Sequence, residues 1–147
     1  MWHSITSQND LLVFLDLINY FHDSCIKEMK YVSGAYVNDD LSMYPLNSVN
    51  TLSVIFQRQS ENFLTFELEF SNLEFINFFP VSPQYTCEIL DAILIKKDNL
   101  YYWCDSRHVN ESEIEQYDGT VICSSGLRWR SIENNQGTVP NNQGTVP

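Results

Sequence analysis

The chain lacks the motifs and residue surpluses that would assign it at once to a common enzyme class. Its five glycines are isolated, so there is no phosphate-binding loop, no dinucleotide fingerprint and no Gly-x-Ser-x-Gly motif. Basic residues are also scarce: eight Lys and Arg against 19 Asp and Glu give a net charge of −11. Nucleic acids and anionic membranes would be repelled by such a surface, and we expect neither as a partner.

Long apolar runs are missing as well. No stretch approaches the roughly 18 residues of a membrane-spanning helix. The segment Met1-Trp2-His3-Ser4 shows no basic region or cleavage pattern of a signal peptide, so we expect a cytoplasmic protein. Hydrophobic residues still make up 44% of the chain and aromatic residues 14%, which indicates a folded globular domain and not a disordered one.

Paired cysteines are absent too. The four cysteines stand singly at positions 25, 87, 104 and 123, and no two have the spacing of zinc ligands. The histidines at 3, 22 and 108 likewise form no metal-binding motif. We therefore predict no metal and no cofactor. The thiols are expected to be reduced and buried in strands or at strand edges.

The first element that the sequence predicts is an amphipathic helix over residues 8–20. Ser7-Gln8-Asn9-Asp10 is typical of a capping box, with Ser7 as the N-cap. Leucine, isoleucine and phenylalanine then recur at positions 11, 14, 15 and 18, which places one apolar stripe along the helix. Because its side chains are large, this stripe should pack against a sheet.

The following residues predict antiparallel strands. Residues 26–37 are rich in β-formers, with Gly34 as a bulge or a close approach, and 38–50 is expected to be a loop. Strict alternation over 52–56 and 66–70 indicates a sheet with one apolar and one wet face. Residues 87–96 and 100–104 predict a hairpin in which Ile95 opposes Tyr102 and Leu94 opposes Trp103.

The last third predicts a short helix over 110–118, a strand over 120–130 bulged at Gly126, and a tail. Residues 134–140 and 141–147 repeat the same seven letters, Asn-Asn-Gln-Gly-Thr-Val-Pro. We predict a single α+β domain over 1–133 and a flexible repeat tail over 134–147. The N-terminal helix should pack on an antiparallel sheet of about six to eight strands, curled as a sandwich or half-barrel.

The segment Phe21-His22-Asp23-Ser24-Cys25 crowds reactive side chains where the helix ends. A Cys25 thiolate made by His22 and oriented by Asp23 would be a nucleophile. In an extended segment, however, positions 22 and 25 point to opposite faces. The alternative is that His22 and Asp23 close the helix end and Cys25 packs inward. We predict no catalytic site, with these three residues as the only candidates.

A second group of residues is typical of a binding surface. Tyrosine and methionine anchor many interfaces, and acidic clusters orient a basic partner. The candidate binding residues are Tyr36, Asp39, Asp40, Met43, Tyr44, Glu111, Glu113 and Glu115. The same acidity can also serve solubility alone, which is the alternative explanation of the charge.

The Phe21-to-Glu28 segment, between a helix and a series of strands, resembles the opening of a group of small bacterial proteins. Those proteins share a Phe/Trp-His-Asp-x-x-Ile pattern, are mostly uncharacterised, and include some that are similar to immunity proteins of polymorphic toxin systems. The resemblance covers about eight residues and brings no catalytic residues with it. It implies a protein that neutralises a basic toxin.

Two functions follow as hypotheses. The first is a non-enzymatic protein-binding module, with a basic protein as its partner and an immunity protein as the specific form. The alternative is a small enzyme or ligand-binding protein with a pocket near His22 and Cys25. The sequence predicts no oligomeric state.

Overall fold

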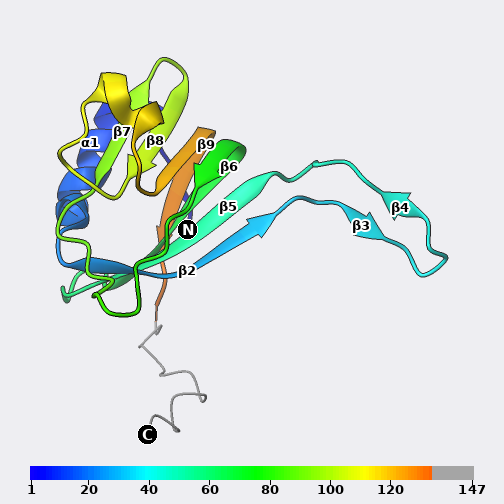
Figure 1. Cartoon of the computed structure of the whole chain (residues 1–147), viewed down its shortest axis with the longest axis horizontal. Helices are drawn as coiled ribbons and strands as arrows, with labels where there is room; N and C mark the ends of the chain where they lie inside the picture. Colours follow the sequence, from blue (N-terminus) through cyan, green and yellow to red (C-terminus); the bar gives the residue numbers. More distant parts are fainter. Residues whose placement is uncertain (134–147) are drawn as a thin grey trace, which may run out of the picture.

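The computed structural model describes residues 1–133, and the tandem repeat predicted to be a flexible tail lies outside the described residues. A seven-stranded antiparallel sheet, one α-helix and two short 3-10 helices make up the body, from which a thin hairpin projects (Figure 1). The elements are β1 (His3–Ser4), α1 (Gln8–Leu17), η1 (Asn19–Phe21), β2 (Ser24–Val32), β3 (Tyr36–Val37), β4 (Met43–Tyr44), β5 (Thr51–Arg58), β6 (Thr65–Asn77), β7 (Ile93–Lys97), β8 (Leu100–Cys104), η2 (Glu111–Gln116) and β9 (Val121–Ser131).

The sheet has the strand order β2-β5-β6-β9-β8-β7, with β1 added to β9. The predicted α+β class, N-terminal helix and antiparallel sheet are confirmed. The predicted curling into a sandwich or half-barrel is not seen, because the sheet is neither closed nor strongly curled. Its end strands β2 and β7 are separate, and a single bridge between Ser24 and Ile89 links β2 to the chain before β7.

Helix α1 begins as the sequence predicts. The Ser7 hydroxyl accepts from the Asp10 amide, and the Asp10 carboxylate accepts from the Ser7 amide, each at 3.0 Å. Leu11, Phe14 and Leu15 are buried against the sheet, which confirms the apolar stripe. The helix ends at Leu17 and not at residue 20, because Asn19, Tyr20 and Phe21 all take positive φ.

We expect Leu15→Ala to destabilise the protein by about 2–5 kcal/mol, because a buried leucine loses its apolar contacts and leaves a cavity. Val13 of α1 points away from the stripe and is 60% exposed, so Val13→Ala is the matched control and should change stability by less than about 0.5 kcal/mol. Urea unfolding of both variants checks this. Similar losses from the two substitutions would contradict the packing of α1.

The capping contacts predict a dependence on pH. Hydrogen bonds from the Thr6 backbone, the Ser7 hydroxyl and the Ser7 backbone hold the pKa of Asp10 below its ordinary value of 3.8. When folding lowers the pKa of a carboxyl group, that group stabilises the protein at pH values above the pKa it has in the unfolded chain. The stabilisation is lost as the pH falls through the pKa of the group in the folded protein. The stability difference between the wild type and Asp10→Ala should therefore be constant near neutrality and shrink below about pH 3.8. Thermal unfolding at several pH values measures it; a difference that persists at the lowest pH would contradict the charge-based cap.

The chain turns from α1 into β2 through backbone that few residues adopt. Asn19, Tyr20, Phe21 and Asp23 have φ between +51° and +63°. Such a conformation costs an L-residue about 1–2 kcal/mol, and several in succession are rare. The turn places the Phe21 ring at 0% exposure in the centre of the core. Burial of that ring is the interaction that offsets the strain.

The central strands follow the predicted alternation. Leu52, Val54 and Phe56 of β5 and Phe66, Leu68 and Phe70 of β6 are buried on the face that α1 covers. On the other face, Glu67 and Glu69 pair with Arg130 and Arg128 of β9 at 2.6 and 2.7 Å. The predicted hairpin register is also confirmed, since Ile95 pairs with Tyr102 and Leu94 with Trp103.

A second, smaller apolar cluster lies on the opposite face of β8 and β9. Tyr102, Cys104 and Cys123 pack there beneath η2, whose Ile114 is 1% exposed. The predicted helix over 110–118 is thus a 3-10 helix with Asn110 before its first residue. The six residues of η2 cover this face at β8 and β9, whereas α1 packs on the opposite face of the sheet.

Three local expectations need correction. Residues 38–50 are irregular as predicted except for Met43–Tyr44, which forms β4 and pairs with β3 in the outer part of a hairpin. The sequence predicts a bulge at Gly126 of β9, but the bulge lies in the neighbouring strand β6, between Leu73 and Phe75. Gly126 itself packs against Ser71. Cys87, expected in a buried strand, is exposed in irregular backbone because β7 begins only at Ile93.

Candidate functional site

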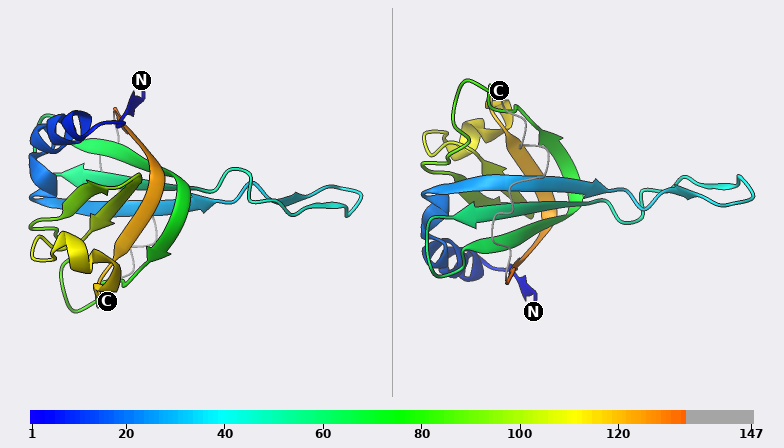
Figure 2. Two further views of the ribbon diagram at one scale, coloured as in Figure 1. Left: turned by 90° about the horizontal axis from the view of Figure 1, so that it is seen from above. Right: turned by 90° about the horizontal axis from the view of Figure 1, so that it is seen from below.

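The most prominent surface feature is the hairpin of residues 33–50, which we call the hairpin arm. It continues β2 and β5 beyond the sheet and extends away from the body (Figure 1, Figure 2). Gly34 allows the two limbs to approach each other. It has φ +92°, and a Cβ there would lie 2.8 Å from the Val49 nitrogen. A residue with a side chain would push the limbs apart at the base of the arm.

The hairpin arm exposes an unusual amount of apolar surface. Five of its large apolar side chains are each more than half exposed: Tyr36, Val37, Leu41, Met43 and Leu46. The Tyr36 and Tyr44 rings stack at 5.1 Å, so Tyr44 is partly covered. The predicted exposure of Tyr36 and Met43 is therefore seen, and both residues lie at the same end of the molecule.

The tip of the arm is ordered by one carboxylate. Asp40 accepts hydrogen bonds from the Ser42 hydroxyl at 2.6 Å and the Ser42 amide at 2.9 Å, and these bonds lower the pKa of Asp40. Asp39 and Asp40 are the only charged residues of the arm. The tip consequently carries two negative charges at neutral pH, next to apolar side chains.

The second predicted acidic cluster does not join the first. Glu111, Glu113 and Glu115 lie on η2 (yellow in Figure 1), at the end of the molecule opposite the arm. Glu115 also accepts a hydrogen bond from the Tyr102 hydroxyl at 2.7 Å. Burial and this bond raise the pKa of Tyr102. The candidate binding residues thus form two separate surfaces.

Residues 21–25, which we call the His22 segment, hold the chain before β7 in place. His22 Nδ1 lies 2.5 Å from the carbonyl oxygen of Leu90, a distance that requires the imidazole to donate. Its Nε2 lies 3.4 Å from Asp23. Ser24 forms the bridge to Ile89 and donates its hydroxyl to the Phe21 carbonyl at 2.6 Å. These contacts hold Ile89 and Leu90 in the segment of residues 78–92, which we call the pocket loop.

The proposed nucleophile is not assembled. Cys25 lies on β2 opposite Gln57, and among the described residues no hydrogen bond or ion pair joins its sulfur to His22 or Asp23. His22 is directed to the pocket loop instead. Within residues 1–133 no group of three His, Cys, Asp or Glu side chains is placed to hold a metal ion.

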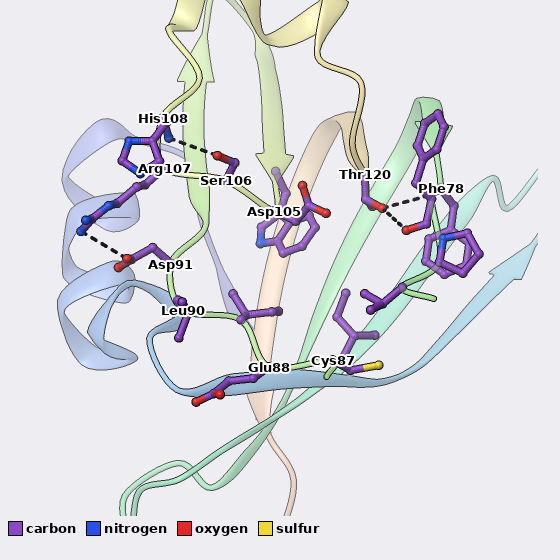
Figure 3. A pocket seen from close by; sticks show the side chains of 16 residues that line it. Phe78, Cys87, Glu88, Leu90, Asp91, Asp105, Ser106, Arg107, His108 and Thr120 are labelled. Carbon is purple, nitrogen blue, oxygen red and sulfur yellow. Dashed lines mark hydrogen bonds and ion pairs between the residues drawn. The ribbon is translucent and has the colours of Figure 1, made fainter. Parts of the chain in front are cut away.

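A cavity of about 540 Å³ lies under the pocket loop (Figure 3). Its position agrees with the alternative hypothesis only in part, because neither His22 nor Cys25 lines it, whereas Leu90 and Asp91 beside His22 do. The cavity has apolar walls from β2, the pocket loop and β8: Ile26, Phe78, Phe79, Pro80, Val81, Ile89, Leu90 and Trp103.

Polar groups enter the cavity from the segment after β8. Arg107 pairs with Asp91 at 3.2 Å, and Ser106 accepts a hydrogen bond from the His108 amide at 3.2 Å. Trp103 lines the cavity, and its buried Nε1 has no hydrogen-bond partner among the described residues. The buried Oδ1 of Asp105 lies beside Gly119 and Tyr117. The Tyr117 hydroxyl interacts with the same Asp105 carboxyl group. The pKa of Tyr117 is raised to about 12, mainly because the residue is buried and secondly because of this interaction.

Comparison of the chain with protein-family models, curated proteins and solved structures found no match. No helix in the part of the chain that the structure describes is long and apolar enough to cross a membrane. The site must therefore be interpreted from its own chemistry.

Proposed function

We propose that this chain is a non-enzymatic protein-binding module that binds a basic protein through its hairpin arm. The observation that carries the proposal is the arm itself: apolar side chains that are more than half exposed, held away from the body (Figure 2). A contiguous exposed apolar surface on a monomer marks an interaction site. An isolated two-stranded hairpin is also marginally stable in water, so a partner would stabilise it.

Charge selects the class of partner. The arm presents Asp39 and Asp40 at its tip, and the whole chain carries −11. A second copy of this chain would be repelled, whereas a basic protein would be attracted and oriented. A basic toxin, as the partner of an immunity protein, is the specific form of this proposal, and it rests on the resemblance of the Phe21-to-Glu28 segment.

The test is capture of a partner from the native host at low and at high salt. We expect a protein of basic isoelectric point whose association slows as salt rises, because screening over about 8–10 Å removes the steering. Asp39→Lys with Asp40→Lys should weaken binding about 10-fold or more, by reversing the charge at the contact. Reversal of Glu111 and Glu113, at the other end, should weaken it less.

Two further variants separate the arm from the His22 segment. His22→Ala and Cys25→Ala should leave partner binding unchanged while the fold survives, because neither residue lies on the arm. Purified partner and calorimetry measure this. Binding that is insensitive to the arm substitutions, together with a turnover that depends on Cys25, would reject the proposal in favour of an enzyme.

A further inference from the structure

We infer that β7 is an open sheet edge that binds an extended segment of another protein as an added strand, one with an acidic residue followed by alternating apolar residues. Strand β7 lies at the end of the sheet opposite β2, which carries the hairpin arm (Figure 1). The site is therefore separate from the arm and does not depend on the proposed function. The inference rests on the backbone of β7, the groove between β7 and α1, and an unpaired lysine.

The outer edge of β7 offers backbone groups to an added strand. Among the described residues, the backbone of β7 pairs with β8 alone. The two-residue turn Asp98–Asn99 makes Lys97 and Leu100 a hydrogen-bonded pair, and such pairs alternate along an antiparallel ladder. The N–H and C=O groups of Leu94 and Lys96 therefore point away from β8. An extended backbone matches this spacing of donors and acceptors, which makes a peptide strand the class of ligand.

A groove of about 370 Å³ lies between α1 and β7, beside this edge. Leu12 and Leu15 of α1 form one wall, and residues 92–95 form the other. Leu12 is 45% exposed in this apolar groove. Ala92 and Leu94 are buried on the face of the sheet that α1 covers. Apolar side chains of an added strand that lie opposite these two residues would enter the groove and cover Leu12.

The charge along the groove selects an acidic residue. By alternation, Lys96 lies on the same face of the sheet as Leu94. Its ammonium donates to the Asp98 carbonyl oxygen at 3.1 Å, and it forms no ion pair among the described residues. At the other end, Asp91 and Arg107 line the groove and pair with each other at 3.2 Å. A carboxylate opposite Lys96 would supply the counter-ion that this lysine lacks within residues 1–133.

These contacts define the order of side chains in the ligand. Every strand pair of the seven-stranded sheet is antiparallel, and the added strand takes the same direction. Its first residue then lies opposite Lys96, its third opposite Leu94 and its fifth opposite Ala92. An acidic residue at the first position and apolar residues at the third and fifth suit the face that α1 covers. The second and fourth side chains lie beside the half-buried Ile95 and Ile93, where β-branched residues pair well.

The alternative occupant of an open edge is a second copy of the same chain. Two copies each carry −11, and lysines on an edge strand oppose self-pairing. Strand β7 also lacks the required order, since its sequence Ile-Leu-Ile-Lys-Lys contains no acidic residue to meet Lys96. A different protein therefore supplies the strand.

The test uses the capped peptide Ser-Glu-Thr-Leu-Thr-Val-Ser, titrated into the nitrogen-15-labelled full chain. We expect saturable shifts of the Leu94 and Lys96 amide signals and slower hydrogen exchange at both, because their N–H groups become bonded. N-methylation of the peptide leucine, whose N–H faces β7, should weaken binding about 10-fold or more. The matched control is N-methylation of the threonine that follows it, whose N–H faces away, and its binding should stay within about threefold.

Three variants test the groove and the charge. Leu12→Ser should weaken binding about 5-fold or more by removing apolar surface from the wall. Val13→Ser is the matched control, because Val13 is 60% exposed and does not line the groove, and it should change binding by less than about twofold. Lys96→Glu should reverse the preference between the peptide and its form with lysine in place of glutamate.

Three results would overturn the inference: equal weakening by the two N-methyl groups, a charge preference that Lys96→Glu leaves unchanged, or no saturable shift at Leu94. Equal losses from Leu12→Ser and Val13→Ser would also contradict it, because only Leu12 lines the groove. Shifts at Leu94 and Lys96 that grow with protein concentration alone would place a second copy on the edge and reject the proposed ligand.

Discussion

Phe21→Ala should lower the free energy of unfolding by about 3–5 kcal/mol, the usual cost of truncating a fully buried phenylalanine. The Phe21 ring contacts four other aromatic rings, with centroids 5.0 Å away for Phe56, 6.0 Å for Phe66, 6.1 Å for Trp103 and 6.2 Å for Phe14. Domains of this size are stable by about 5–15 kcal/mol, so the variant would be close to its limit.

The substitution also removes the contact that offsets a strained backbone. The left-handed conformation of Asn19, Tyr20, Phe21 and Asp23 remains in the variant, but the burial of the ring that compensates for its cost is lost. Urea unfolding measures the effect, and Phe78→Ala is the matched control because Phe78 is 56% exposed. A loss below about 1 kcal/mol at Phe21 would show that the turn does not position the ring in the core.

Local chemistry made much of the body predictable. The Ser7–Asp10 capping box and the alternation in β5 and β6 depend on residues that are neighbours along the chain or face one another across one ladder. The register of β7 and β8 follows from the short connection at Asp98, which takes φ +56°. The overall class was predictable for the same reason, but the degree of sheet curling was not, because it depends on all the strands together.

The features that position the candidate sites were not predictable from neighbouring residues. Asparagine, aspartate and proline over 38–50 are typical of loops, and only two residue pairs, Tyr36–Tyr44 and Val37–Met43, reveal the outer strands of the arm. The left-handed turn carries no glycine that would signal it. The cavity forms where Trp103 meets the pocket loop and Ile26, which are far apart in the sequence. His22 looked like a catalytic base, yet it donates to a backbone carbonyl, a contact that no motif encodes.

Shortening the hairpin arm should have the largest effect on function. We expect replacement of residues 35–47 by Asn-Gly, a pair that favours tight hairpin turns, to weaken binding of the basic partner by about 100-fold or more. A few buried anchors carry most of the binding energy of an interface, and this change removes Tyr36, Met43 and the acidic tip together. A loss of 100-fold corresponds to about 2.8 kcal/mol.

The body of the protein should tolerate that change. The stacked ring pair and the Asp40–Ser42 bonds lie within the removed segment, while Gly34 and Ser48 at its base are kept. Two bonds to the remaining chain are lost, from the Tyr31 hydroxyl to Asn47 at 3.0 Å and from the Ala35 amide to the Ser33 hydroxyl at 3.1 Å. Tyr31 keeps its bond to Asn50. The free energy of unfolding should therefore stay within about 1 kcal/mol of the wild type. Calorimetry with purified partner and urea unfolding measure the two quantities on the same sample. Partner binding retained within threefold by a folded, shortened chain would place the interface elsewhere on the body and reject the arm as the binding element.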